Sequence, residues 1–286
     1  ATLRRQRQMC IRDRYRTISF SPNGEYVMIS QINKPFSYLV TYSRFPTETN
    51  VYSKDGDFVS NLQKVPLIEE LPKGFMSVRT GKRSFNWRPD KGASLTYVTA
   101  LDSGDPSKKV DFRDEVYELN YPFSGKGKFI LKTINRFSGI DWGTKDMAIA
   151  YDTWWNTRNR KSYVFNPSNP NIKPKIISDR NYQDTYSDPG NFLRSRNEFN
   201  RSVLKMHYGN IFLRGQGFSP SGQFPFIDKV NTKTFEKTRV YQSSYTDKIE
   251  SIIDYDPKKN QLTVSIESPS EYPCLLYTSP SPRDCQ

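Results

Sequence analysis

Cysteine is absent from residues 15–273, because the three cysteines of the chain, Cys10, Cys274 and Cys285, lie near its two ends. That absence excludes a disulfide framework, a cysteine-ligated zinc site and a thiol nucleophile across the bulk of the chain. No other pattern indicates a metal or a cofactor, and we expect neither. No apolar run approaches the roughly 20 residues that span a bilayer, so we expect a soluble chain without membrane insertion.

Histidine is nearly absent too, since His207 is the only one in 286 residues. A Ser-His-Asp triad needs an imidazole as its general base, so His207 would have to serve. Its neighbours Leu204, Met206 and Ile211 place it in or beside an ordinary strand, which favours a structural role. The nucleophile elbow Gly-x-Ser-x-Gly is also missing, and the nearest string, Gly217–Gly222, has the wrong spacing. We therefore predict no catalytic residue in this chain.

Helix signals are missing, because no amphipathic stretch with capping residues is found. Hydrophobic residues make up only 35% of the chain, whereas aromatic residues reach 14%, and 19 Pro and 15 Gly interrupt it. This composition is typical of an all-β protein with many turns and a core rich in Tyr, Phe and Trp.

A recurring unit predicts the architecture: an aromatic residue, then a tight polar turn, then an alternating strand. The unit begins at Phe20, Trp87, Trp142 and Tyr255, and a weaker copy lies near Met206. Repeats at roughly 50–60 residues indicate a propeller in which each repeat is one four-stranded blade. We expect an all-β fold, a partial β-propeller of about four to five blades.

Individual strands can be placed from alternation and turn signals. At the start we expect strands at 17–20, 26–32, 38–42, 50–53 and 58–62, with a tight turn at Asp55-Gly56. Residues 102–128 are predicted to be a long loop that carries one outer strand, and residues 166–200 are predicted to hold loops.

The two ends look foreign. Met9–Arg14 and Cys274–Asp284 resemble translated sequencing adapters, which should be excluded from fold reasoning. We expect three parts: a non-native extension at 1–14, a β-propeller fragment at 15–273 and a non-native extension at 274–286. Without the extensions the net charge falls from +13 to +9, because residues 1–14 hold five Arg and one Asp, and residues 274–286 hold one of each.

Basic residues gather in two short clusters. Arg79-Thr-Gly-Lys-Arg83 precedes one repeat anchor, and Arg158-Asn-Arg-Lys161 follows the pair Trp154-Trp155. Basic and aromatic residues together can track nucleic acid, with bases stacked on the rings. They can equally bind carboxylates through bidentate guanidinium contacts. Either cluster can also be an ordinary solvated face.

Several strings resemble glutamyl endopeptidases of the prolyl oligopeptidase family of serine peptidases. They occur in order along residues 17–273: Lys34-Pro-Phe-Ser-Tyr-Leu-Val, Arg44-Phe-Pro, Val51-Tyr-Ser-Lys-Asp-Gly-Asp-Phe-Val, Ser77-Val-Arg-Thr-Gly-Lys-Arg-Ser-Phe-Asn-Trp-Arg-Pro-Asp90, Arg113-Asp-Glu-Val-Tyr117, Trp154-Trp-Asn-Thr-Arg-Asn-Arg160 and Tyr186-Ser-Asp-Pro-Gly190. The Ser77–Asp90 and Tyr186–Gly190 strings are specific to that subfamily.

The resemblance implies a β-propeller that caps a C-terminal α/β-hydrolase domain, which carries the Ser, Asp and His of the family. The parent would then be a serine-type endopeptidase, whereas this chain lacks its catalytic domain. The implied partners are peptide substrates and that hydrolase domain, and nucleic acid is not expected. Relatives of this kind occur in bacterial envelopes and in chloroplasts, so the resemblance implies a periplasmic or stromal parent.

The resemblance also gives the basic clusters a purpose. Cleavage after glutamate takes a carboxylate out of water, which requires a nearby cation with hydrogen-bonding capacity. We therefore expect this propeller to gate or steer acidic peptides toward the hydrolase domain, using Arg79, Lys82, Arg83, Arg158 and Arg160. The alternative is a propeller without enzymatic function that binds acidic peptides or nucleic acid.

Overall fold

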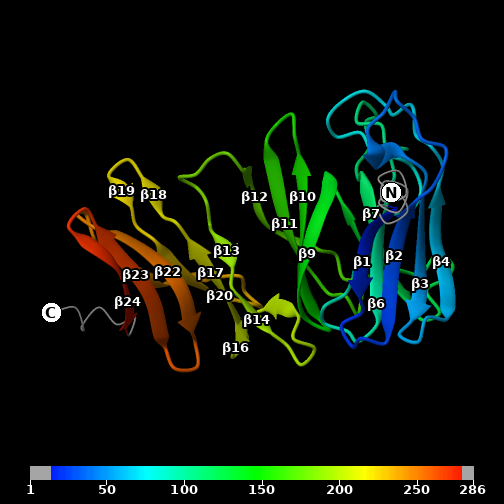
Figure 1. Cartoon of the computed structure of the whole chain (residues 1–286). Coiled ribbons are helices and arrows are strands. Elements are labelled where there is room, and N and C mark those ends of the chain that lie inside the picture. Colours follow the sequence, from blue (N-terminus) through cyan, green and yellow to red (C-terminus); the bar gives the residue numbers. More distant parts are fainter. Residues whose placement is uncertain (1–13, 279–286) are drawn as a thin grey trace, which may run out of the picture.

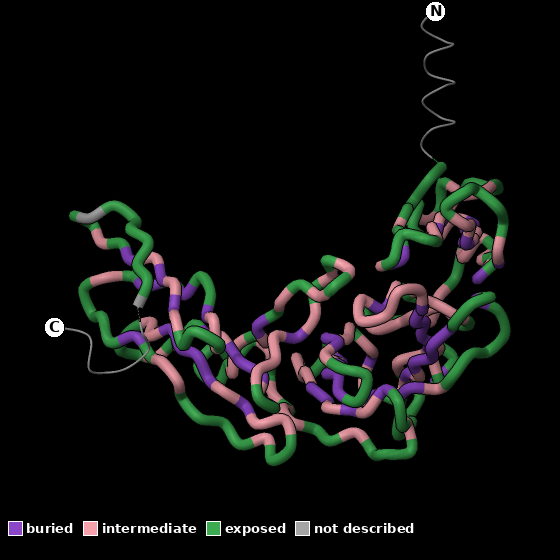
Figure 2. The backbone as a smooth tube through the Cα atoms, turned by 90° about the horizontal axis from the view of Figure 1, so that it is seen from below, coloured by how far each residue is buried: buried purple, intermediate pink, exposed green. Residues whose placement is uncertain are grey.

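The computed structural model describes residues 14–278 and consists almost entirely of antiparallel β-sheet. Within these residues, five sheets of three to five strands follow one another along the chain, together with two short hairpins. The sheets stand side by side in sequence order (Figure 1) and follow an open arc (Figure 2). This confirms the prediction of an all-β partial β-propeller, in which each sheet is a blade. Over the described range, no helix is long and apolar enough to cross a membrane.

Blades 1 to 3 each contain four strands in sequence order. Blade 1 consists of β1 (Tyr15–Phe20), β2 (Tyr26–Ile32), β3 (Thr47–Ser53) and β4 (Phe58–Val65). Blade 2 consists of β5 (Arg83–Trp87), β6 (Ser94–Ala100), β7 (Asp114–Asn120) and β8 (Lys128–Thr133). Blade 3 consists of β9 (Arg136–Thr144), β10 (Met147–Trp154), β11 (Asn159–Phe165) and β12 (Lys175–Asn181).

Blades 4 and 5 are less regular. Blade 4 pairs in the order β13 (Asn191–Phe192), β17 (Asn210–Gly215), β20 (Phe226–Asn231) and β21 (Lys237–Gln242), and β16 (Met206–His207) also pairs with β17. Two hairpins leave this blade, β14 (Arg194–Arg196) with β15 (Ser202–Leu204), and β18 (Phe218–Ser219) with β19 (Gly222–Gln223). Blade 5 consists of β22 (Ile249–Asp256), β23 (Gln261–Ser268) and β24 (Glu271–Thr278).

The loops lie on two opposite faces because antiparallel neighbours reverse direction at every turn. The upper face in Figure 1 carries the loops between second and third strands and the connections between blades: 33–46, 66–82, 101–113, 134–135, 155–158, 182–190, 216–225, 243–248 and 269–270. The lower face carries the remaining loops: 21–25, 54–57, 88–93, 121–127, 145–146, 166–174, 193–209, 232–236 and 257–260.

The repeat anchors join neighbouring blades. Trp87 of blade 2 donates its indole N–H to the Ser19 carbonyl of blade 1 at 3.0 Å. The next residue, Arg88, is fully buried, and its guanidinium lies 3.9 Å from the ring centre of Trp142, the anchor of blade 3. Trp87 and Trp142 therefore link blade 1 to blade 2 and blade 2 to blade 3, whereas Phe20, the anchor of blade 1, is exposed.

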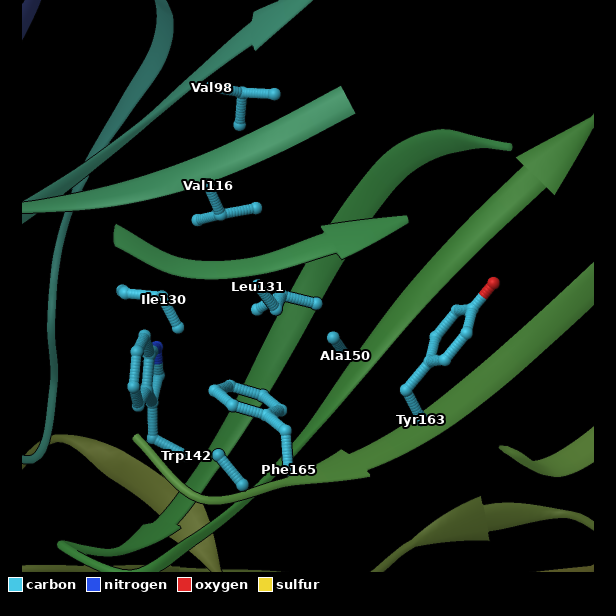
Figure 3. Close-up of a cluster of buried hydrophobic side chains, with 9 residues drawn as sticks. Val98, Val116, Ile130, Leu131, Trp142, Ala150, Tyr163 and Phe165 are labelled. Atoms are coloured by element: carbon cyan, nitrogen blue, oxygen red, sulfur yellow. The ribbon is translucent and has the colours of Figure 1, made fainter. Parts of the chain in front are cut away.

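Apolar side chains fill the space between blades. Figure 3 shows the cluster between blades 2 and 3, where Val98, Val116, Ile130 and Leu131 face Trp142, Ala150, Tyr163 and Phe165. Separate clusters lie between blades 1 and 2, between blades 3 and 4, and between blades 4 and 5. The core is thus divided along the arc, as expected when each repeat contacts mainly its neighbours.

Two local predictions were wrong. Residues 38–42 form no strand, because they belong to the long loop 33–46, which contains only the 3₁₀ turn η1 (Tyr42–Arg44). Pro35 and Pro46 bracket this loop and lack the N–H that a ladder needs. Residues 166–200 are more ordered than predicted, because they contain β12, an exposed edge strand whose charged sequence hides the alternation.

The predicted non-native segments 1–14 and 274–286 lie mostly outside the described residues, 14–278, and stay predictions. Residues 274–278 belong to β24, where Cys274 pairs with Ile266 and Leu276 pairs with Val264 of β23. The propeller range predicted for 15–273 begins where β1 begins.

Candidate functional site

The upper face differs from the lower one in its exposed apolar side chains. Over the described loops, the upper face exposes Phe36, Tyr38, Leu39, Tyr42, Phe75, Leu101, Val110, Phe112, Trp155, Tyr186, Phe218 and Tyr245. The lower face exposes Tyr121, Ile172 and Tyr208. A concentration of exposed apolar side chains on one face favours that face as an interaction site. The candidate functional face is therefore the upper one.

Cations lie among these upper-face aromatics between blades 2 and 3. The Trp155 ring lies 5.5 Å from the Phe75 ring, and the Arg158 guanidinium lies 3.8 Å from the Trp155 ring centre. Arg113 makes the same kind of contact with Trp154 at 4.0 Å. The backbone of Arg158 has a φ of 53°, so this residue occupies a strained conformation at the tip of the β10–β11 turn.

An ion network lies beneath this group. Arg136 of β9 is buried and donates to Asp102 at 2.7 Å and to Asp114 at 3.1 Å. Arg113 also pairs with Asp102 at 2.8 Å, and Arg83 pairs with Asp114 at 2.5 Å. The Arg136 Nε–H donates to the Met76 carbonyl, which ties the 66–82 connection to blade 3. We call these five charged residues the upper ion network.

The two predicted residues at the start of β5 have different environments. Arg83 belongs to the upper ion network, and its positive charge is compensated by buried Asp114. Arg79 donates only to uncharged acceptors, namely the Gln63 side chain and the carbonyls of Thr80 and Lys82. Burial, together with the charges of Arg83 and Arg16, lowers the pKa of Arg79 to about 10.

Arg79, Arg83 and Arg16 line one cavity of about 350 Å³ between blades 1 and 2. Uncharged side chains, including Ser30, Thr47 and Thr49, make up the rest of its lining. Among the residues that line it there is no carboxylate. The cavity therefore offers guanidinium groups and hydroxyls to a ligand, a combination that suits an anion.

The remaining predicted residues do not join this cavity. Lys82 donates to the Gly125 carbonyl at 2.6 Å and lies 4.9 Å from the Tyr97 ring centre, and burial lowers its pKa. Arg158 lies over Trp155 at the upper face. Arg160 lies 4.7 Å from the Tyr151 ring centre and lines a different cavity, between blades 3 and 4. The substrate-binding role of all five stays a prediction.

A hairpin from blade 4 spans the lower face. Asn197, at the tip of the β14–β15 hairpin, donates to the Pro89 carbonyl of blade 2 at 2.7 Å. Arg201 donates to the Phe20 and Ser21 carbonyls of blade 1 at 3.1 and 3.3 Å. Figure 1 shows β14 at the lower edge of the arc. The lower face is thus bridged across the arc, a second difference from the upper face.

His207 lies in β16, half-buried, with its ring 4.2 Å from that of Tyr208. Within residues 14–278 its imidazole forms no hydrogen bond with a serine or a carboxylate. The same range holds no cluster of His, Cys, Asp and Glu suited to a metal ion.

Sequence reasoning missed Arg16, Arg113 and Arg136. Arg113 and Arg136 stand singly in the sequence, so no cluster marks them, and only the fold brings them beside Asp102. The string Arg113-Asp114 was noticed for its resemblance, but not as half of an ion network.

Gly104 lies where the 101–113 loop closely approaches the 66–82 connection, so a substitution there tests this contact. Its φ is +78°, and a Cβ at this position would lie 1.8 Å from the Val78 carbonyl oxygen. Gly104→Ala should therefore lower the free energy of unfolding by roughly 1–3 kcal/mol. Denaturant unfolding measures this, with Gly139→Ala as control, because no atom lies within 4 Å of that added Cβ. Equal effects of the two substitutions would contradict the close approach of these loops.

Comparison with known proteins shows which sequences and folds this chain resembles. No family model matches the chain. It is 37% identical over 246 residues to a probable chloroplastic glutamyl endopeptidase of Oryza sativa subsp. japonica, a match that covers 84% of this chain and 26% of the relative. A protein of the same description from Arabidopsis thaliana is 33% identical over 247 residues, with the same coverage. The chain therefore spans about a quarter of the length of these curated relatives.

Among solved structures, prolyl oligopeptidase B from Galerina marginata aligns with 93% of this chain and 34% of its own, at 8% identity and a TM-score of 0.49. The β-propeller domain of the Trilobed protease from Pyrococcus furiosus aligns with 89% of this chain and 69% of its own, at 11% identity and a TM-score of 0.43.

Proposed function

Because this chain belongs to the glutamyl endopeptidase-like branch of the prolyl oligopeptidase family, as a β-propeller portion, we propose that it guides acidic peptides to a serine peptidase domain elsewhere in its parent protein. The parent would cleave peptide bonds through an acyl-enzyme formed on that other domain. The part described here would bind, select and orient the substrate.

The docking face for the peptidase domain is the upper face in this proposal. Its support is the concentration of exposed aromatic and aliphatic side chains there, from Phe36 and Tyr38 in blade 1 to Tyr186 beside blade 4. An intramolecular domain interface of ordinary size would cover such a surface. The lower face, bridged by Asn197 and Arg201, has few such side chains.

The proposed preference for acidic substrates rests on the surroundings of Arg79. Its guanidinium donates to neutral acceptors and forms no ion pair among the described residues. Of the two cavities that it lines, the one with Arg16 and Arg83 has no carboxylate and the other contains Glu70. A glutamyl side chain that leaves water needs such a cation. Arg158 is the second candidate, because among the described residues it has no carboxylate partner and it lies on the upper face.

A kinetic experiment on the full-length parent tests the proposal. Arg79→Ala and Arg158→Ala should each lower kcat/KM for a glutamyl substrate by about tenfold, since a cation that contacts the substrate is lost. A substrate with a neutral side chain at the same position should change by less than about threefold.

Lys128→Ala is the matched control, because Lys128 is an exposed cation at the lower end of β8. It should leave both substrates unchanged. Equal loss on glutamyl and neutral substrates in the Arg79 and Arg158 variants would reduce these two residues to structural ones. No loss on either substrate would remove them from the site altogether.

A further inference from the structure

A second cavity, of about 520 Å³, lies between blades 3 and 4, away from the one that contains Arg79. Its walls come from β10, β11 and β12 of blade 3, from β13, β17 and β20 of blade 4, and from residues 182, 188–190, 234, 235 and 237. The volume falls within the range of sites for small molecules.

The cavity exists because the facing surface of blade 3 changes character along its strands. Tyr151, Ser162 and Ser178 pair across β10, β11 and β12, and Arg160 pairs with Arg180 in the next row. Toward the other end of the strands, Ile149 packs with Leu204, Ile211 and other apolar residues into a closed core. The cavity borders both parts, because Leu213 and Val230 of that core line it together with the polar rows.

The lining of this cavity is strongly basic. It contains the four cations Arg160, Lys175, Arg180 and Lys237, and one carboxylate, Asp188. Arg180 already binds Asp188 at 2.8 Å. The other three have no ion pair with a carboxylate anywhere in the described residues. Arg160 is half-buried and Lys175 and Lys237 are exposed, so three positive charges without a carboxylate partner line one hollow.

Two of these three cations contact aromatic rings. The Lys175 ammonium lies 4.5 Å from the Phe235 ring centre, and the Arg160 guanidinium lies 4.7 Å from that of Tyr151. Tyr151 is fixed in turn by a hydrogen bond to Asp141 at 2.8 Å. Charges positioned before a ligand arrives lower the ordering entropy that binding requires.

We propose that this cavity is a binding site for a phosphorylated small molecule. Three cations without a carboxylate partner in one cavity match the two or more charges of a phosphoryl group better than the single charge of a carboxylate. Ser162, Ser178 and Asn191 supply further hydrogen-bonding groups to a polar ligand body. The lining of the cavity extends from β12, the last strand of blade 3, to β13, the first strand of blade 4, and we assign the site to binding or regulation.

Calorimetric titration of the full chain with inorganic pyrophosphate tests this site at low salt. Pyrophosphate should bind, and the double variant Arg160→Gln, Lys237→Gln should bind it at least about tenfold more weakly. Neither substitution leaves a buried carboxylate unpaired, so the variant should keep the circular dichroism and melting temperature of the parent chain.

Two comparisons decide the chemistry. The double variant Lys108→Gln, Lys109→Gln removes two exposed charges from the 101–113 loop, and it should bind pyrophosphate as the unmodified chain does. Succinate, a dicarboxylate, should bind at least about tenfold more weakly than pyrophosphate. The proposal is overturned by an absence of binding at roughly 10 mM pyrophosphate, by equal weakening in both double variants, or by succinate binding as tightly as pyrophosphate.

Discussion

Arg136→Ala is expected to lower the free energy of unfolding by about 3–5 kcal/mol. The side chain is 4% exposed and lies between Asp102 and Asp114, whose side chains are fully buried. Its removal leaves each carboxylate with one cation in the upper ion network, Arg113 for Asp102 and Arg83 for Asp114, and with one backbone N–H donor. A buried charge that loses its central partner is far more destabilising than a lost surface pair. Denaturant unfolding of the variant measures the effect.

Two further variants separate charge from packing. Arg196→Ala removes an exposed arginine that donates only to the Asn200 carbonyl, and it should change stability by less than about 1 kcal/mol. Arg136→Met combined with Asp102→Asn should recover much of the loss, because it removes a buried carboxylate together with the cation. A loss in Arg136→Ala no larger than in Arg196→Ala would show that the network contributes no stability.

The same network connects stability to the proposed function. Arg136 binds the Met76 carbonyl, next to Phe75, whose ring contacts Trp155 and thereby the support of Arg158. A substitution that removes the contacts of Arg136 should therefore change the structure of the upper face and also lower the stability of the core. Loss of activity in Arg136 variants of the parent would reflect positioning, not contact with substrate.

The architecture was predictable because its determinants are local. The turn after Phe20 has local determinants: Gly24 adopts a φ of 77°, and the Ser21 hydroxyl accepts the Tyr26 N–H at 3.0 Å. Strand β12 was missed because an exposed edge strand needs no apolar alternation. The segment 38–42 has alternation but no partner strand, so its alternation was misleading.

The candidate site was predictable only in part, because neutralisation of a charge depends on distant residues. Arg79 and Arg83 look equivalent in sequence, yet Arg83 is compensated by Asp114, which is brought to it by the fold of blade 2. Likewise Arg158 and Arg160 are only two residues apart, yet they have different surroundings. Arg160 lines the cavity between blades 3 and 4, whereas Arg158 lies over the Trp155 ring.

Glu118→Gln is expected to lower the free energy of unfolding at pH 7 by about 3–4 kcal/mol. Glu118 is buried on β7 and forms ion pairs with Arg88 at 3.0 Å and with Lys91 at 2.6 Å, and it also accepts the Ser94 hydroxyl. Arg88 is itself fully buried against Trp142, so the substitution leaves its guanidinium with Asp90 alone. The variant thus weakens the junction between blades 2 and 3.

The pH dependence of this effect distinguishes the charge from the shape of the side chain. Burial by itself would raise the pKa of Glu118, but the hydrogen bonds from Lys91 and Ser94 and the charge of Arg88 outweigh it and hold the pKa below its usual 4.5. A depressed folded-state pKa means that the unfolded chain binds the proton more tightly, so stability is present above pH 4.5 and is lost as pH falls through the folded-state value.

The difference in unfolding free energy between the unmodified chain and Glu118→Gln should therefore be constant from pH 7 to about 5.5 and shrink below pH 4.5. Unfolding measured at several pH values tests this, with Glu198→Gln, an exposed carboxylate, as control. The control should show a small difference at every pH. If this difference in unfolding free energy stays constant down to pH 3, the substitution destabilises the protein through the geometry of the amide group. The carboxylate charge would then not hold these two blades together.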